Sequence, residues 1–181
     1  MSGDYETLAK NQPDIYYTKS SSNMKQIFSN QFYYQFKMPD FDILKERLET
    51  IEKFDDGDFT WGELCKIERD SYNVNDFFDI LVKPVGMLSG QLGVKFNAKI
   101  SHPWLNRYDR GGFQEIHYHD DCDIAAVVFL NDGEDFSKFY FWDSNHTAFT
   151  KPWIKILTQM KLSNIYYPEV KAGDVLLFPS H

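Results

Sequence analysis

Residues 104–130 read WLNRYDRGGFQEIHYHDDCDIAAVVFL, and this stretch holds most of the information about the fold. It joins an aromatic segment, a turn rich in Asp, Arg and Gly, two histidines in one tripeptide and an unbroken apolar run. Short apolar segments between turn residues are typical of β-strands. We therefore expect a series of strands from residue 94 onward, at 94–100, 104–108, 115–117, 124–130, 139–142, 164–167 and 175–178.

The part of the chain before residue 94 predicts two helices. Apolar residues at spacings of three and four indicate a helix over 41–54, which Asp40 or Asp42 is suited to start. A second apolar face predicts a helix over 75–92. Pro84 should kink or shorten that helix, because proline removes a backbone donor and clashes with the preceding turn.

Helices followed by many evenly spaced strands predict the fold class. We expect a mainly β protein in which helices support a double-stranded β-helix, the jelly-roll or cupin-like architecture. The aromatic, alternating segment 31–37 should add a strand. Residues 1–25 are polar and predict an N-terminal arm, whereas 26–181 should form one domain, which is incomplete at its C-terminal end.

Composition and charge narrow the classes of function. The 181 residues carry a net charge of −8, which disfavours nucleic acid as a partner because phosphate binding depends on Lys and Arg. No apolar run approaches the roughly 20 residues that a membrane span needs. Cys65 and Cys122 make no disulfide framework. We therefore expect a cytoplasmic protein without a membrane partner.

The tripeptide His117-Tyr118-His119 is the candidate metal centre. Alternate residues of a strand face the same side, so both imidazoles could point into one cavity. Asp121 lies two residues further on and offers a carboxylate. Two histidines and one carboxylate leave positions open on a metal, as Fe(II) oxygenases require. Alternatively, this acidic segment is simply a solvated strand end.

The residues before His117 resemble a known motif. Asn106 and Tyr108 stand in an NxYxxG pattern, and His117 follows Asn106 by eleven residues. This block resembles the alkylation-repair dioxygenases, in which the Asn and Tyr side chains contact 2-oxoglutarate and the first His binds iron. The resemblance implies these roles for Asn106, Tyr108 and His117. His119 occupies the position where that family has an Asp.

A second resemblance covers residues 28–181. The pattern WxNxY, HxH, an apolar strand and GDxLxFPS is similar to the small 2-oxoglutarate–Fe(II) oxygenases of marine phages and bacteria, within the prolyl-hydroxylase-like superfamily. It implies an Fe(II)- and 2-oxoglutarate-dependent dioxygenase that hydroxylates a small-molecule or peptidyl substrate and releases succinate and CO2. The segment 171–180 is similar to the strand that delivers the distal histidine. Either His181 is that ligand or the ligand and an anchoring Arg or Lys lie beyond it, and we favour the second.

Two alternatives stay open from the residues alone. Either His117 and His119 bind the iron and Asp121 contacts one of them from the outer shell, or the ligands are His119 and Asp121. We prefer His117 with His119, because the spacing from Asn106 then holds. A cupin-like metal-binding protein without oxygenase activity is the alternative function, although the second cupin motif, PxGxxH, is not found in the sequence.

Overall fold

The computed structural model describes residues 23–28, 31–54, 67–144 and 164–180. Within these segments the chain forms eight strands, two α-helices and one short 3-10 helix. All strand pairings among them are antiparallel, in one sheet of four strands and two sheets of two strands. The expectation of a mainly β fold with supporting helices is confirmed.

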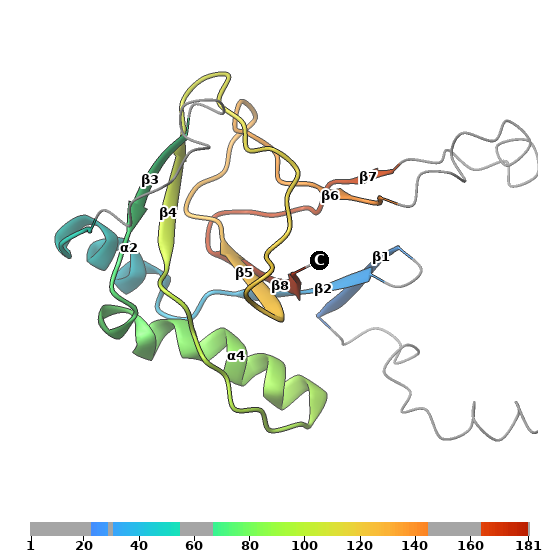
Figure 1. Cartoon of the computed structure of the whole chain (residues 1–181), viewed down its shortest axis with the longest axis horizontal. Coiled ribbons are helices and arrows are strands. Elements are labelled where there is room, and N and C mark those ends of the chain that lie inside the picture. The colour runs from blue at the N-terminus through green and yellow to red at the C-terminus, as the bar shows by residue number, and fades with distance from the viewer. Residues whose placement is uncertain (1–22, 29–30, 55–66, 145–163, 181) are drawn as a thin grey trace, which may run out of the picture.

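The four-stranded sheet has the order β1-β2-β8-β5 and forms the centre of the molecule (Figure 1). Its strands are β1 (Met24–Phe28), β2 (Gln31–Lys37), β8 (Asp174–Pro179) and β5 (Ile124–Val128). Val175, Leu176 and Leu177 of β8 are at most 2% exposed. β8 lies between β2 and β5, and its side chains are buried on both faces of the sheet. Its sequence is therefore a continuous apolar run.

Two smaller sheets complete the β structure. β3 (Ile67–Ser71) pairs with β4 (Trp104–Tyr108), and β6 (Phe141–Trp142) pairs with β7 (Ile165–Tyr166). β3 lies directly opposite β4, with Arg69 facing Asn106 in the register. This pairing sets the position of the strand on which the candidate 2-oxoglutarate contacts lie.

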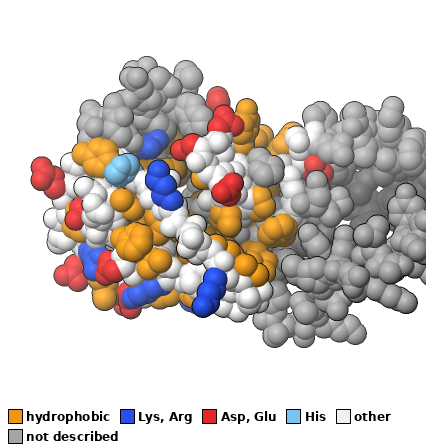
Figure 2. All heavy atoms as spheres, turned by 60° about the horizontal axis from the view of Figure 1, so that its bottom comes forward, with side chains coloured by type: hydrophobic (Ala, Val, Ile, Leu, Met, Phe, Trp, Pro, Cys, Tyr) orange, Lys and Arg blue, Asp and Glu red, His pale blue; other side chains and the backbone are white. Residues whose placement is uncertain are grey.

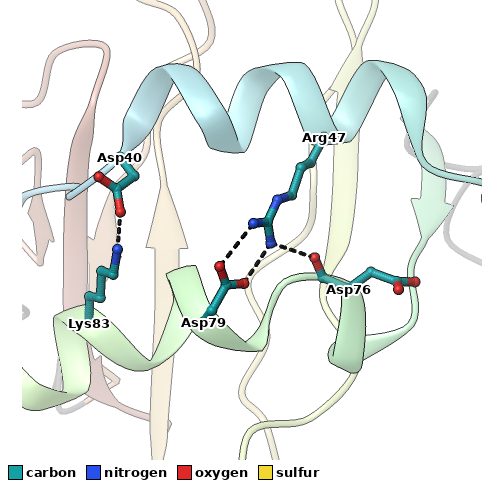
Figure 3. A network of polar contacts seen from close by, with 5 residues as sticks. All are labelled: Asp40, Arg47, Asp76, Asp79 and Lys83. Atoms are coloured by element: carbon teal, nitrogen blue, oxygen red, sulfur yellow. Dashed lines mark hydrogen bonds and ion pairs between the residues drawn. The ribbon is translucent and has the colours of Figure 1, made fainter.

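The helices α2 (Phe41–Thr50) and α4 (Phe78–Leu92) lie side by side and are joined by ion pairs (Figure 3). Arg47 donates two hydrogen bonds to the Asp79 carboxylate, at 2.6 and 2.9 Å, and one to the Asp76 carbonyl at 2.8 Å. Lys83 pairs with Asp40. Asp40 thus sits at the start of α2 as expected, but its side chain binds the neighbouring helix instead of capping its own.

The helix predicted over 75–92 is divided in the structure. A 3-10 turn, η2 (Val74–Asp76), precedes α4, and Asn73 caps it by accepting from the Asn75 backbone N–H. α4 continues through the buried Pro84 to a left-handed Gly93 at φ 65°. Proline therefore does not shorten this helix. The helix predicted over 41–54 is shorter than expected and ends at Thr50. The chain bends at Ile51, and Phe54 forms a β-bridge with Ser71.

The core lies between these helices and the central sheet. Tyr72 is fully buried, donates its hydroxyl to the Leu48 carbonyl at 3.1 Å and packs edge-on against Phe77. The cluster also contains Tyr34, Phe36, Met38, Leu44, Ile80, Leu88, Val175 and Leu177. On the face turned forward in Figure 2, hydrophobic side chains remain visible between charged ones. No helix of the described residues is long and apolar enough to span a membrane.

Two predicted strands are wrong, and two observed strands were not predicted. Residues 94–100 and 115–117 are extended or irregular and join no sheet among the described residues. Val94 and Phe96 are 52% and 39% exposed, so the apolar residues there are not buried as strand residues of the core would be. β1 starts within the segment expected to be a polar arm, of which residues 1–22 lie outside the described residues. β3 was missed because its sequence, IERDS, is mostly charged.

Candidate functional site

One face of β4 presents the site residues predicted on this strand. Residues two apart on a strand point to the same side, so Trp104, Asn106 and Tyr108 share a face. Asn106 Nδ2 donates to Gln114 Oε1 at 3.3 Å, and the Tyr108 hydroxyl donates to the same oxygen at 2.8 Å. The two predicted 2-oxoglutarate contacts are therefore joined by a residue that the sequence did not single out.

A tight reversal after β4 returns the chain to this face. The Gly112 N–H donates to the Asp109 carbonyl at 2.7 Å, and Gly111 takes a left-handed φ of 81°. Glycine adopts this conformation without the penalty that a Cβ imposes. The turn brings Gln114 back against Asn106 and Tyr108, and the histidine segment follows three residues later.

Asn106 carries an unusual polar atom. Its Oδ1 is buried and has no hydrogen-bond partner among the described residues. Such an atom is costly, because an unpaired buried amide oxygen loses its bonds to water without replacement. An unpaired amide oxygen can accept a hydrogen bond from a polar ligand, and a rotated amide would present its N–H at the same position.

The two histidines meet although they lie on no strand. The His117 and His119 ring centroids are 5.1 Å apart with planes at 80°. His117 Nδ1 lies 2.7 Å from the Glu115 carbonyl, which can only accept, so Nδ1 carries a proton and Nε2 is the nitrogen left to bind a metal. This is the tautomer in which a second hydrogen bond orients a metal-binding imidazole. The tripeptide thus brings both rings together by a local bend, not by strand alternation.

The end of β8 is fixed to the histidine segment. The His119 N–H donates to the Ser180 carbonyl at 2.9 Å, and the Ser180 N–H donates to the Asp123 carbonyl at 3.3 Å. The Ser180 hydroxyl also donates to the Cys122 carbonyl. The backbone that leaves β8 is therefore adjacent to His119. His181, the alternative distal ligand, lies outside the described residues.

The surroundings of His119 favour its neutral imidazole. Burial lowers the pKa of His119, and the neighbouring His117 and Arg69 lower it further, whereas Asp121 acts in the opposite direction. The His119 ring also packs 5.9 Å from the Trp104 ring, which carries the Arg69 guanidinium over its face at 4.5 Å. Neutral imidazole is the form that binds metals.

The separation of the two imidazole rings is compatible with two ligands of one metal ion. Imidazole nitrogens bind zinc at about 2.0–2.1 Å, so two rings on one ion have centroids roughly 4.5–5.3 Å apart at bond angles of about 90–110°. The observed separation of 5.1 Å falls in this range. No group of three or more His, Cys, Asp or Glu residues that could hold a metal occurs among the described residues, so Asp121 does not complete a triad there. The third donor has to come from elsewhere in the chain or from a ligand.

Comparison with known protein families agrees with this arrangement. Residues 102–181 match the family model described as "Putative 2OG-Fe(II) oxygenase". The chain is similar to this oxygenase family over these 80 of its 181 residues. The matched segment of this oxygenase family begins just before β4 and contains Asn106, Tyr108, His117 and His119. Searches of curated proteins and of solved structures return no match. The resemblance to 2-oxoglutarate–Fe(II) oxygenases inferred from the sequence is confirmed.

Proposed function

We propose that this protein is an Fe(II)- and 2-oxoglutarate-dependent dioxygenase that hydroxylates an organic substrate and releases succinate and CO2. The family match over residues 102–181 supports an oxygenase role. We assign residues 26–181 to one oxygenase domain built on a double-stranded β-helix. The antiparallel pairing of β2, β8 and β5 is compatible with this jelly-roll architecture.

The observation that carries the proposal is the contact between the histidine pair and the end of β8. His117 and His119 would hold Fe(II), with His117 binding through Nε2. Because the His119 N–H donates to the Ser180 carbonyl at 2.9 Å, a residue that follows Ser180 would reach the same ion. His181 is then the candidate for the distal ligand. Asp121 remains the alternative to His119 and otherwise accepts a hydrogen bond from a ligand imidazole.

The face of β4 would hold 2-oxoglutarate. Asn106 and Tyr108 offer an amide and a hydroxyl side by side, and both can donate to a carboxylate. Arg69 faces the same side of the sheet, across from Asn106, and its positive charge favours a dianionic co-substrate. Trp104 covers His119 and reduces the access of water to it. Iron and 2-oxoglutarate supply the oxidising chemistry when bound, and these residues orient them.

The surface beside the site favours an organic substrate with apolar groups. Phe113 and Ile116 are each 55% exposed, both in the segment between β4 and β5. Exposed apolar side chains around a polar site commonly contact a ligand. A small molecule or a peptidyl segment fits this surface. Separately, we propose that the protein is cytoplasmic.

Turnover tests the proposal directly. Protein loaded anaerobically with Fe(II) should form succinate from 2-oxoglutarate when O2 is added, and His117→Ala should not. The matched control is Tyr118→Phe, which removes an exposed hydroxyl from the same tripeptide and should keep this activity. Metal binding without any succinate above the level of free Fe(II) would instead identify the cupin-like alternative.

A further inference from the structure

Gln114 connects both residues that we assign to 2-oxoglutarate. Its Oε1 accepts from Tyr108 at 2.8 Å and from Asn106 at 3.3 Å. Gln114 belongs neither to the NxYxxG pattern nor to the histidine tripeptide, so neither motif assigns it a role.

The hydrogen bonds of the triad Asn106, Tyr108 and Gln114 point in the wrong direction for binding a carboxylate. In the structure the Asn106 amide N–H and the Tyr108 hydroxyl both donate to Gln114, while the Asn106 oxygen is buried and unpaired. A carboxylate only accepts, so it needs donors in place of that oxygen. The triad would therefore have to reverse when a carboxylate binds.

Rotation of two side-chain amides accomplishes this reversal. If Gln114 turns its Nε2 toward its partners, its two N–H groups can donate to Asn106 Oδ1 and to the Tyr108 oxygen. Asn106 then turns its Nδ2 to the buried position that Oδ1 occupies now. The Tyr108 hydroxyl hydrogen becomes able to point to another acceptor. No atom has to move far, because the two ends of an amide have nearly the same size.

We infer that Gln114 is a positioning residue that reverses the polarity of Asn106 and Tyr108 so that both donate to a carboxylate of 2-oxoglutarate. This inference rests on the proposed function. A primary amide is required, since it alone among neutral side chains offers an acceptor in one orientation and two donors in the other. In Gln114→Glu the carboxylate side chain could only accept hydrogen bonds from Asn106 and Tyr108. It would hold both residues in the orientation that they have when no co-substrate is bound.

Two substitutions separate this role from a structural one. Gln114→Met keeps the length and removes both hydrogen-bonding ends, and Gln114→Glu keeps the acceptor and removes the donor. We expect 2-oxoglutarate affinity to fall roughly five- to thirtyfold in Gln114→Met, as the loss of one or two ordinary hydrogen bonds predicts. Gln114→Glu should lose at least as much, with the Tm retained. Gln114→Met adds no charge. If both variants lose affinity, the loss in Gln114→Glu is therefore not explained by repulsion between its carboxylate and 2-oxoglutarate alone.

The experiment is an anaerobic calorimetric titration of 2-oxoglutarate into protein loaded with Mn(II). Mn(II) affinity is measured first and should be unchanged in both variants, and Gln91→Met serves as an exposed control on α4. In an Asn106→Ala, Tyr108→Phe background, Gln114→Met should cause no further loss, because it acts through those two residues. An additional loss there, or normal affinity with a lowered Tm, would overturn the inference and leave the proposed function standing. If the unaltered protein binds Mn(II) but not 2-oxoglutarate, both are overturned. Should Gln114→Met fail to fold, Gln114→Glu decides in the Asn106→Ala, Tyr108→Phe background, because charge repulsion would persist there and a positioning effect would not.

Discussion

Removing the Tyr108 hydroxyl is the most informative single change at the proposed co-substrate site. Tyr108→Phe deletes a donor that lies 2.8 Å from Gln114 and leaves the ring in place. A hydrogen bond to a charged partner contributes about 1.5–3 kcal/mol, so 2-oxoglutarate affinity should fall roughly ten- to a hundredfold. Tyr108 is 39% exposed, and water can replace its bond to Gln114 in the free protein. The free energy of unfolding should therefore fall by less than about 1 kcal/mol.

Anaerobic titration of 2-oxoglutarate into metal-loaded protein measures the first quantity, and urea denaturation measures the second. Tyr118→Phe is the matched control, because Tyr118 is 67% exposed and lies between the two histidines. It should change neither quantity. Normal 2-oxoglutarate affinity in Tyr108→Phe together with a clear loss of stability would refute the reasoning, since the hydroxyl would then only hold the turn before Gln114.

Three further predictions concern the metal and the fold. His117→Ala should abolish Fe(II) binding in calorimetry, whereas Asp121→Asn should weaken it only about tenfold to a hundredfold, as expected of an outer-shell partner; the reverse order would make Asp121 a ligand. Leu176→Ala should lower the free energy of unfolding by about 2–5 kcal/mol, because Leu176 is 0% exposed at the centre of the main sheet, and a loss under 1 kcal/mol in urea denaturation would be inconsistent with that burial. Burial alone would raise the pKa of Asp70, but hydrogen bonds from Lys53 and Arg107 outweigh it and lower the pKa. Because the folded-state pKa lies below the unfolded one, this stabilisation is complete at neutral pH and is lost as the pH falls below about 4. The stability difference between the unaltered protein and Asp70→Asn should shrink over that range, and a difference independent of pH would show that the ion pairs do not contribute.

The sequence predicts those strands that carry several apolar or aromatic side chains of their own. β4 matches its predicted bounds, and β8 was recognised by the apolar run that the sheet buries. β3 has three polar residues between Ile67 and Ser71, so it shows no pattern of its own. It is a strand because it pairs with β4, and Asp70 binds both Lys53 and Arg107. Contacts between segments distant in the sequence do not appear in local periodicity.

The candidate site shows the same limit. The resemblance to a family motif pointed to Asn106 and Tyr108, and the HxH tripeptide pointed to the histidine pair. Gln114 was missed because its importance depends on the reversal at Gly111, which returns the chain to β4. Strand alternation was the wrong reason for expecting the two imidazoles to meet, since residues 115–117 form no strand. A bend held by the Glu115 carbonyl and Ser180 brings them together instead.

The most direct test of the central claim is an anaerobic absorption titration of the Fe(II)-loaded protein with 2-oxoglutarate. If His117 and His119 hold an iron ion that the keto acid chelates, a visible charge-transfer band should grow and saturate at one equivalent. The band should be absent in His117→Ala. Binding of Fe(II) by the unaltered protein without any such band at saturating 2-oxoglutarate would contradict the claim.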